Sequence, residues 1–83
     1  MNTFTLEVLT LERPIYSGEV TSLTAPGAQG EFGILADHAP FVSELKRGNL
    51  KINPMGGAEK TIPLKRGFLR VEKNHVVVLA EPE

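Results

Sequence analysis

Glycine and proline divide this chain into short segments and so limit what it can fold into. The 83 residues include eight glycines and six prolines, spaced by roughly ten residues. The longest stretch free of both runs from Phe68 to Glu81, and the polar residues Glu72–His75 interrupt it. No segment keeps a 3.6-residue apolar period over a length that would form a stable helix. The spacing therefore predicts many short strands joined by turns.

Between these breaks, the apolar residues follow β-strand patterns. Phe4, Leu6 and Val8 alternate with polar residues, which predicts a strand with one buried face. The clearest strands are expected at 4–8, 15–16, 20–25, 31–35, 41–45, 50–52, 60–64, 68–72 and 76–79. Turns are expected at Pro26–Gly30 and Lys65–Gly67. We predict an all-β fold, a single domain over residues 1–83 built as a β-sandwich or flattened barrel of about ten strands, with no helical domain.

Composition narrows the class of protein further. The hydrophobic fraction of 41% is typical of a globular domain, and no apolar run approaches the ~20 residues that span a bilayer. The chain has no cysteine, which excludes disulfides and thiolate metal sites. The N-terminal residues lack a basic and an apolar region, so we expect no signal peptide. A domain of this size has a small stability margin, which burial against a partner would increase.

Charge is unevenly distributed and leaves one alternative function open. Residues 1–45 contain one basic and six acidic side chains, whereas residues 46–83 contain eight basic and four acidic ones. The basic second half would suit a small β-barrel that binds nucleic acid, but such barrels need exposed aromatic rings for base stacking. The aromatic positions favour core packing instead; they are Phe4, Tyr16, Phe32, Phe41 and Phe68.

No constellation of residues predicts catalysis or metal binding. Asp37 and His38 are adjacent, so their side chains diverge on an extended backbone and do not suit a catalytic triad. A zinc site would need both histidines, His38 and His75, with carboxylates from distant strands. The glycines in Gly27–Gly33 resemble a phosphate-binding loop, but no helix follows them. We therefore predict no catalytic residue, no metal site and no cofactor. A small hydrolase using Asp37 and His38 would need a nucleophile that the sequence does not indicate.

The segment Gly30–Leu35, followed by His38–Pro40, is the most specific feature of the chain. Its two glycines frame Glu31, which we expect to project from a rigid turn. With this segment, the chain resembles the N-terminal β-sandwich domain of the ATP synthase epsilon subunit, called delta in mitochondria. The resemblance extends over the whole length, through residues 4–8, 17–20, 46–48, 67–71 and 76–80. Ala36–Asp37 departs from it, because the family often has Pro-Asn or Pro-Gly there.

The resemblance implies a non-catalytic subunit of a rotary, proton-translocating ATP synthase. Such a subunit lies in the central stalk and couples the gamma subunit to the membrane ring of c subunits. The implied location is peripheral, on the cytoplasmic face of the bacterial inner membrane, with the plastid thylakoid as the alternative. No nucleic acid and no small-molecule ligand is expected.

The family's contact residues transfer by position. The implied c-ring contacts are Gly27, Ala28, Gln29, Gly30, Glu31 and Phe32. The implied gamma contacts are Thr10, His38, Ala39, Pro40, Phe41, Val42 and Ser43. Bacterial relatives continue into a helical hairpin that inhibits the motor and in some binds ATP. This chain is expected to be a short form without that hairpin, so neither property is ascribed to it.

Overall fold

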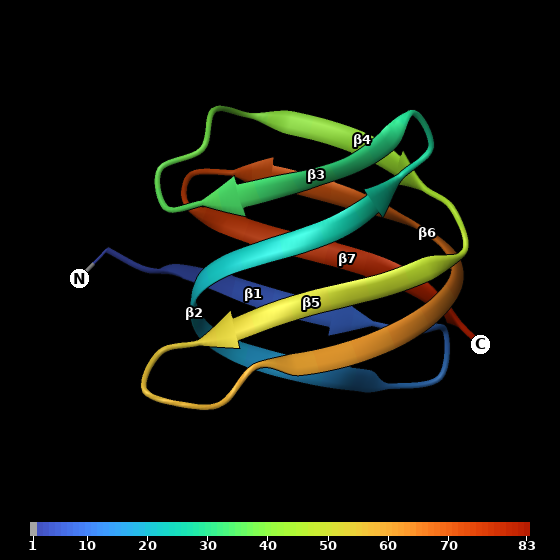
Figure 1. Ribbon diagram of the computed structural model, residues 1–83, viewed down its shortest axis with the longest axis horizontal. Helices are drawn as coiled ribbons and strands as arrows, with labels where there is room; N and C mark the ends of the chain where they lie inside the picture. Colours follow the sequence, from blue (N-terminus) through green and yellow to red (C-terminus); the bar gives the residue numbers. More distant parts are fainter. Residues whose placement is uncertain (1) are drawn as a thin grey trace.

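Residues 2–83 fold into seven β-strands, whose arrangement is shown in Figure 1. The computed structural model describes residues 2–83 and contains no helix among them, so none of the described residues forms a helix that could cross a membrane. The strands are β1 (Phe4–Leu9), β2 (Pro14–Gly27), β3 (Gly30–Leu35), β4 (Phe41–Leu45), β5 (Gly48–Pro54), β6 (Lys60–Glu72) and β7 (His75–Pro82). The predicted all-β class is confirmed, and the predicted number of about ten strands is wrong.

Two long strands account for the lower number. β2 has 14 residues and joins the strands expected at 15–16 and 20–25. β6 has 13 residues and joins those expected at 60–64 and 68–72. The turn predicted at Lys65–Gly67 is also wrong, because these residues lie inside β6. The pairing of β6 with β7 shifts register between Leu64 and Arg66. Such an irregularity bends a strand without ending it.

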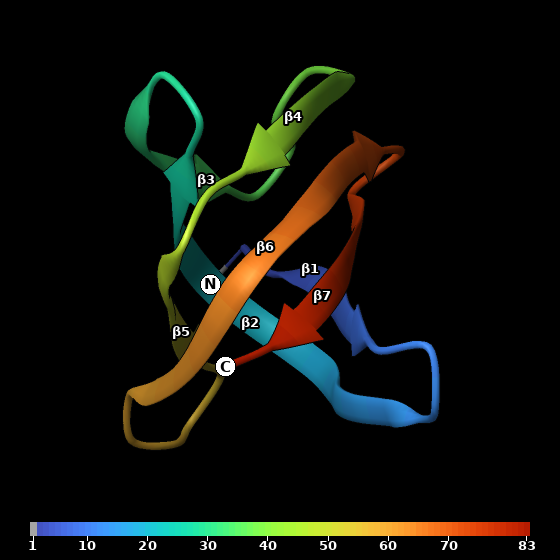
Figure 2. The same cartoon turned by 90° about the vertical axis from the view of Figure 1, so that its right-hand side faces the viewer.

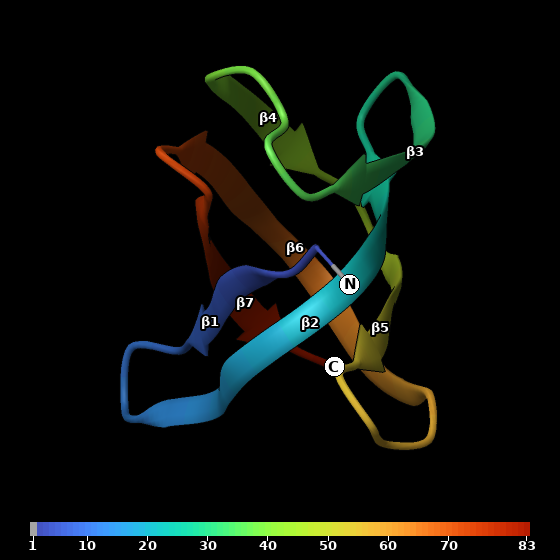
Figure 3. The same cartoon turned by 90° about the vertical axis from the view of Figure 1, so that its left-hand side faces the viewer.

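The two bent strands link all the others into one sheet that closes on itself. β1, β7, β6, β4, β2 and β3 are neighbours in that order, β5 pairs with both β2 and β6, and β1 pairs with β2. The β1–β7 pair is parallel and the other pairs are antiparallel. β2 pairs with β1 through its first half and with β5 and β3 through its second. Figures 2 and 3 show the resulting layers crossing each other around the interior.

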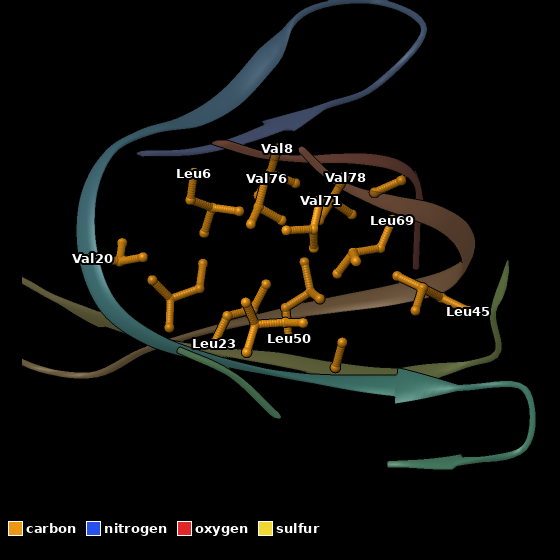
Figure 4. Packing of buried hydrophobic residues seen from close by; sticks show 14 of the residues in the cluster. Leu6, Val8, Val20, Leu23, Leu45, Leu50, Leu69, Val71, Val76 and Val78 are labelled. Carbon is orange, nitrogen blue, oxygen red and sulfur yellow. The ribbon is translucent and has the colours of Figure 1, made fainter. Parts of the chain in front are cut away.

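A wholly apolar core fills that interior. Every buried side chain among the described residues is apolar, and none is polar or charged. The side chains of Leu6, Val20, Leu50 and Leu69 come from four different strands and point into the same space (Figure 4). The core members are Phe4, Leu6, Val8, Val20, Leu23, Ala25, Ile34, Leu45, Leu50, Ile52, Leu64, Leu69, Val71, Val76, Val78 and Ala80. Close packing of this kind makes the body of the molecule stiff.

The prediction that all five aromatic residues serve the core is correct for four of them. Phe4 is fully buried, and Tyr16, Phe32 and Phe41 are half-buried against the core. The prediction is wrong for Phe68, which is 57% exposed on the outer face of β6. Neighbouring residues in a strand face opposite sides. Leu69, the residue after Phe68, is the one that enters the core.

Candidate functional site

The tip of the β2–β3 hairpin has a tightly constrained backbone. Gly27 pairs with Gly30 across the two-residue turn Ala28–Gln29. Gly27 is buried, and a Cβ atom there would lie 2.6 Å from the Gly30 carbonyl oxygen and 2.8 Å from the Phe32 ring. Gly30 has a φ of 135°, in the region that favours glycine. The shape of this turn therefore requires both glycines.

Strand β4 holds the hairpin tip from the side. The Ala28 N–H donates a hydrogen bond to the Glu44 carbonyl oxygen, and the Lys46 N–H donates to that of Pro26, both at 2.9 Å. Glu31 lies beside this turn and is exposed. None of the ion pairs among residues 2–83 involves it. Its carboxylate is therefore displayed on a rigid base and is free to meet a positive charge.

His38 is held within the connection between β3 and β4. Its Nδ1 lies 2.7 Å from the Ala39 carbonyl oxygen. Because a carbonyl oxygen only accepts, Nδ1 carries the proton and donates this bond. The Asp37 carboxylate is therefore not the partner of this nitrogen. The His38 ring lies 5.5 Å from the Phe41 ring, which meets Phe32 edge to face at 5.2 Å.

Some of the residues implied to contact two different partners line the same groove. Gly27–Phe32, from the hairpin tip, and Phe41–Glu44, from β4, surround an open volume of about 500 Å³. Figure 3 shows the hairpin and β4 on either side of this end of the molecule. The structure therefore brings the implied c-ring contacts close to three of the seven implied gamma contacts, Phe41, Val42 and Ser43. Thr10 is separate, because it lies in the β1–β2 connection on another side of the molecule (Figure 2).

Thr10 closes the connection in which it lies. Its N–H and its hydroxyl donate hydrogen bonds to the Arg13 carbonyl oxygen, at 2.9 and 2.8 Å. The hydroxyl oxygen also accepts from the Arg13 N–H at 3.1 Å. This local network fixes the connection that leads from β1 into β2. Thr10 also lines a second concavity of about 500 Å³, most of whose lining residues belong to β6 and β7.

An exposed apolar patch that the sequence analysis did not predict lies along this second concavity. We call it the outer patch, formed by Leu9, Leu11, Phe68 and Leu79. Leu9 lies opposite Leu79, and Leu79 lies opposite Phe68 on the next strand. Leu11 is fully exposed, Phe68 is 57% exposed and Leu79 is 53% exposed. Val42, 68% exposed on β4, is the diagonal neighbour of Phe68. A contiguous group of large apolar side chains on so small a domain indicates a binding surface.

The sequence of β7 carries a signal for this patch. Val76–Leu79 is apolar at every position, which is typical of a strand covered on both faces. The inner face of β7 packs on the core, but none of the residues from 2 to 83 covers Leu79 on the outer face, which stays 53% exposed. The apolar outer face is consistent with a cover supplied by another molecule.

Acidic residues near the C-terminus neutralise part of the basic second half. Arg47 forms an ion pair with Glu83. The Glu81 carboxylate lies 2.9 Å from Arg66 and 3.8 Å from Lys65. Three of the eight basic side chains in residues 46–83 are therefore paired, which weakens the positive field that nucleic-acid binding requires. In the part of the chain that the structure describes, no three potential metal ligands converge.

A polar cluster outside the core joins β1 to its neighbours. The hydroxyl groups of Thr5 and Thr3 donate hydrogen bonds to the Glu19 carboxylate on β2, and electrostatic interaction with the nearby His75 adds a smaller effect. Together they hold the pKa of Glu19 below its ordinary value of 4.5. His75 Nε2 also lies 2.8 Å from the Glu7 carboxylate of β1. The cluster therefore adds side-chain contacts between the N-terminal strand β1 and the two strands that pair with it, β2 and β7.

The whole domain matches one protein family. Residues 3–82 match the family described as the ATP synthase delta/epsilon chain, beta-sandwich domain. The chain belongs to this family. It is 42% identical over 80 residues to the ATP synthase epsilon chain of Syntrophomonas wolfei and 37% identical over 81 residues to that of Campylobacter fetus. These alignments cover 96% and 98% of this chain but only 58% and 63% of the relatives, so the chain spans little more than half of their length.

Chains in solved structures of mitochondrial ATP synthases share this fold. The structure is similar to a chain of the mitochondrial ATP synthase of Euglena gracilis, with a TM-score of 0.89 and 24% sequence identity, over 96% of this chain and 51% of that one. A chain of the Tetrahymena thermophila mitochondrial ATP synthase, from a structure of the central stalk and c-ring, matches with a TM-score of 0.79 and 15% identity. That match covers 93% of this chain and 62% of the other. At these identities, the likeness concerns the fold alone.

Proposed function

We propose that this chain is a non-catalytic central-stalk subunit of a rotary, proton-translocating ATP synthase that couples the gamma subunit to the c ring. The observation that carries the proposal is the family match over residues 3–82. The bacterial relatives are themselves ATP synthase epsilon chains. The chain would then be held, through the complex, on the cytoplasmic face of the bacterial inner membrane.

The c ring is the proposed partner of the hairpin tip, residues Gly27–Phe32. The tip has a backbone that hydrogen bonds to β4 keep in place, and it displays the unpaired carboxylate of Glu31. A basic side chain on a polar loop of the ring would form an ion pair with it. Because exposed ion pairs contribute only about 0.2–1 kcal/mol, this contact would set orientation more than affinity.

The gamma subunit is the proposed partner of the outer patch. This surface runs from the Thr10 connection across β7 and β6 toward the outward-facing Val42 on β4, and thus links Thr10 and Val42, two separated residues that family resemblance assigns to gamma. Aromatic side chains such as Phe68 are enriched in protein interfaces, and a contiguous exposed apolar surface like that of Phe68 and Leu79 marks an interaction site. His38–Pro40 would extend the same contact at the far end of β4.

Rigidity supports a role in transmitting torque. β2 and β6 each pass from one layer of the fold to the other, and the buried side chains between the layers are all apolar. A close-packed body of this kind deforms little under load. Displacement of one contact surface would therefore be transmitted to the other.

Reconstitution tests the proposal. A complex assembled with gamma and the c ring but without this chain should couple proton flow to ATP synthesis poorly. Adding the purified chain should restore synthesis, and Phe68→Ser should restore less of it than the matched exposed variant Met55→Ser. Met55 lies in the β5–β6 turn, far from the outer patch (Figure 1). Full synthesis by complexes that lack the chain would contradict the proposal.

A further inference from the structure

The β6–β7 turn has a backbone conformation that asparagine adopts more readily than most residues. Lys73 and Asn74 form this two-residue turn between the paired residues Glu72 and His75. Their φ angles are 51° and 61°. Two-residue hairpins with positive φ at both positions favour asparagine and glycine. The turn alone would therefore accept glycine at position 74.

The side chain of Asn74 makes contacts that glycine could not. Its Nδ2 donates a hydrogen bond to the Thr3 carbonyl oxygen, and its Oδ1 accepts one from the Asp37 N–H, both at 2.8 Å. Its own carbonyl oxygen accepts from the Thr5 N–H at 3.2 Å. The Thr3 carbonyl oxygen can only accept a hydrogen bond and the Asp37 N–H can only donate one, so the two partners fix the orientation of the Asn74 amide. Asn74 thus joins three segments: the N-terminal segment, the β6–β7 turn and the β3–β4 connection.

The β3–β4 connection depends on this contact. Asp37 has a φ of 64°, in the left-handed region that residues with a Cβ atom adopt infrequently, aspartate more often than most. Among the described residues, the bond from Asp37 to Asn74 is the one hydrogen bond that links residues 36–40 to another part of the chain. The neighbouring bond, from His38 to Ala39, is internal to the connection.

We infer that Asn74 is a positioning residue, which pre-orders the connection carrying His38–Pro40 for contact with the gamma subunit. The inference rests on the proposed function, and Asn74 itself is not among the proposed contact residues. A connection that is free in solution must lose conformational entropy when a partner binds, which weakens binding. The hydrogen bond from Asp37 to Asn74 already orders the connection in the free chain, so less conformational entropy is lost when gamma binds.

Two glycine variants separate this role from the turn itself. Asn74→Gly keeps the positive φ and deletes both side-chain hydrogen bonds. Lys73→Gly is the matched control, since it changes the same turn and leaves those bonds in place. The first measurement is the amide hydrogen exchange of Asp37 by NMR in the isolated chain. The intrinsic rate of this amide depends on its sequence neighbours, which neither variant alters.

The second measurement is the affinity for purified gamma subunit. Asn74→Gly should raise the exchange rate of the Asp37 amide and weaken gamma binding, each by about five- to tenfold, the size of one net hydrogen bond. Lys73→Gly should change both by less than about twofold. Unchanged Asp37 exchange in Asn74→Gly would overturn the positioning role.

Two other outcomes would also contradict the inference. Faster exchange with unchanged affinity would show that the ordered connection does not serve binding. If the parent chain itself fails to bind gamma, the proposed function fails and the role toward gamma fails with it. The exchange measurement needs no partner, so it still decides whether Asn74 orders the connection.

Discussion

Replacing Gly27 by alanine should destabilise the domain because the hairpin tip has no room for a methyl group. The added Cβ would lie 2.6 Å from a backbone oxygen of Gly30 and 2.8 Å from two carbons of the Phe32 ring. The ring cannot move away freely, because it packs edge to face on Phe41. Overpacking of this kind costs about 1–3 kcal/mol, and the lower entropy of the unfolded alanine chain offsets about 0.4–1 kcal/mol of it.

The expected net loss is about 1–2 kcal/mol, which would lower the melting temperature of a domain of this size by roughly 5–15 °C. Urea unfolding followed by circular dichroism measures the loss directly. Gly33→Ala is the matched control, since the nearest atom to its added Cβ is the Leu23 carbonyl oxygen at an ordinary 3.8 Å. Equal stabilities of the two variants would refute the claim that close packing requires glycine at position 27.

Three further predictions concern the partners and pH. Glu31→Gln should weaken binding to the c ring by about two- to fivefold and reduce its salt dependence, which a salt titration would measure; unchanged binding would exclude the ion pair. Phe68→Ser should weaken gamma binding by roughly 30-fold, or about 2 kcal/mol, while Met55→Ser leaves it unchanged; calorimetry would show whether the two differ. Glu19→Gln should lower stability at neutral pH. Because the folded-state pKa of Glu19 is depressed, its contribution is present above the ordinary pKa of 4.5 and is lost as pH falls through the folded value. The gap between parent and variant in urea unfolding should therefore close in acid, and a gap that stays constant with pH would argue against this role.

Local patterns in the sequence predicted which residues lie in strands, but they did not predict where one strand ends and the next begins. The alternation of Phe4, Leu6 and Val8 gave the buried face of β1 correctly. The interruptions expected between residues 16 and 20 and at Lys65–Gly67 are instead parts of β2 and β6. Whether a strand ends or bends at such a point depends on the strands that pair with it, and these are distant in the sequence.

In the candidate site, too, features that depend on neighbouring residues could be predicted, and features that depend on residues far away in the sequence could not. The turn framed by Gly27 and Gly30 could be predicted, because its glycines respond to contacts within the hairpin itself. The outward orientation of Phe68 could not be, because adjacent apolar residues leave the inner face of a strand ambiguous. The role of Asn74 was equally inaccessible, since its side-chain partners lie 37 and 71 residues away.

Site-specific crosslinking in the assembled complex would test the central claim, that one rigid body contacts gamma and the c ring through different surfaces. The chain has no cysteine, so a photoreactive group can be attached to a single introduced one. Glu31→Cys should crosslink to subunit c, Phe68→Cys to gamma, and Met55→Cys to neither. Identical crosslinking from all three positions, or none from the first two, would contradict the account.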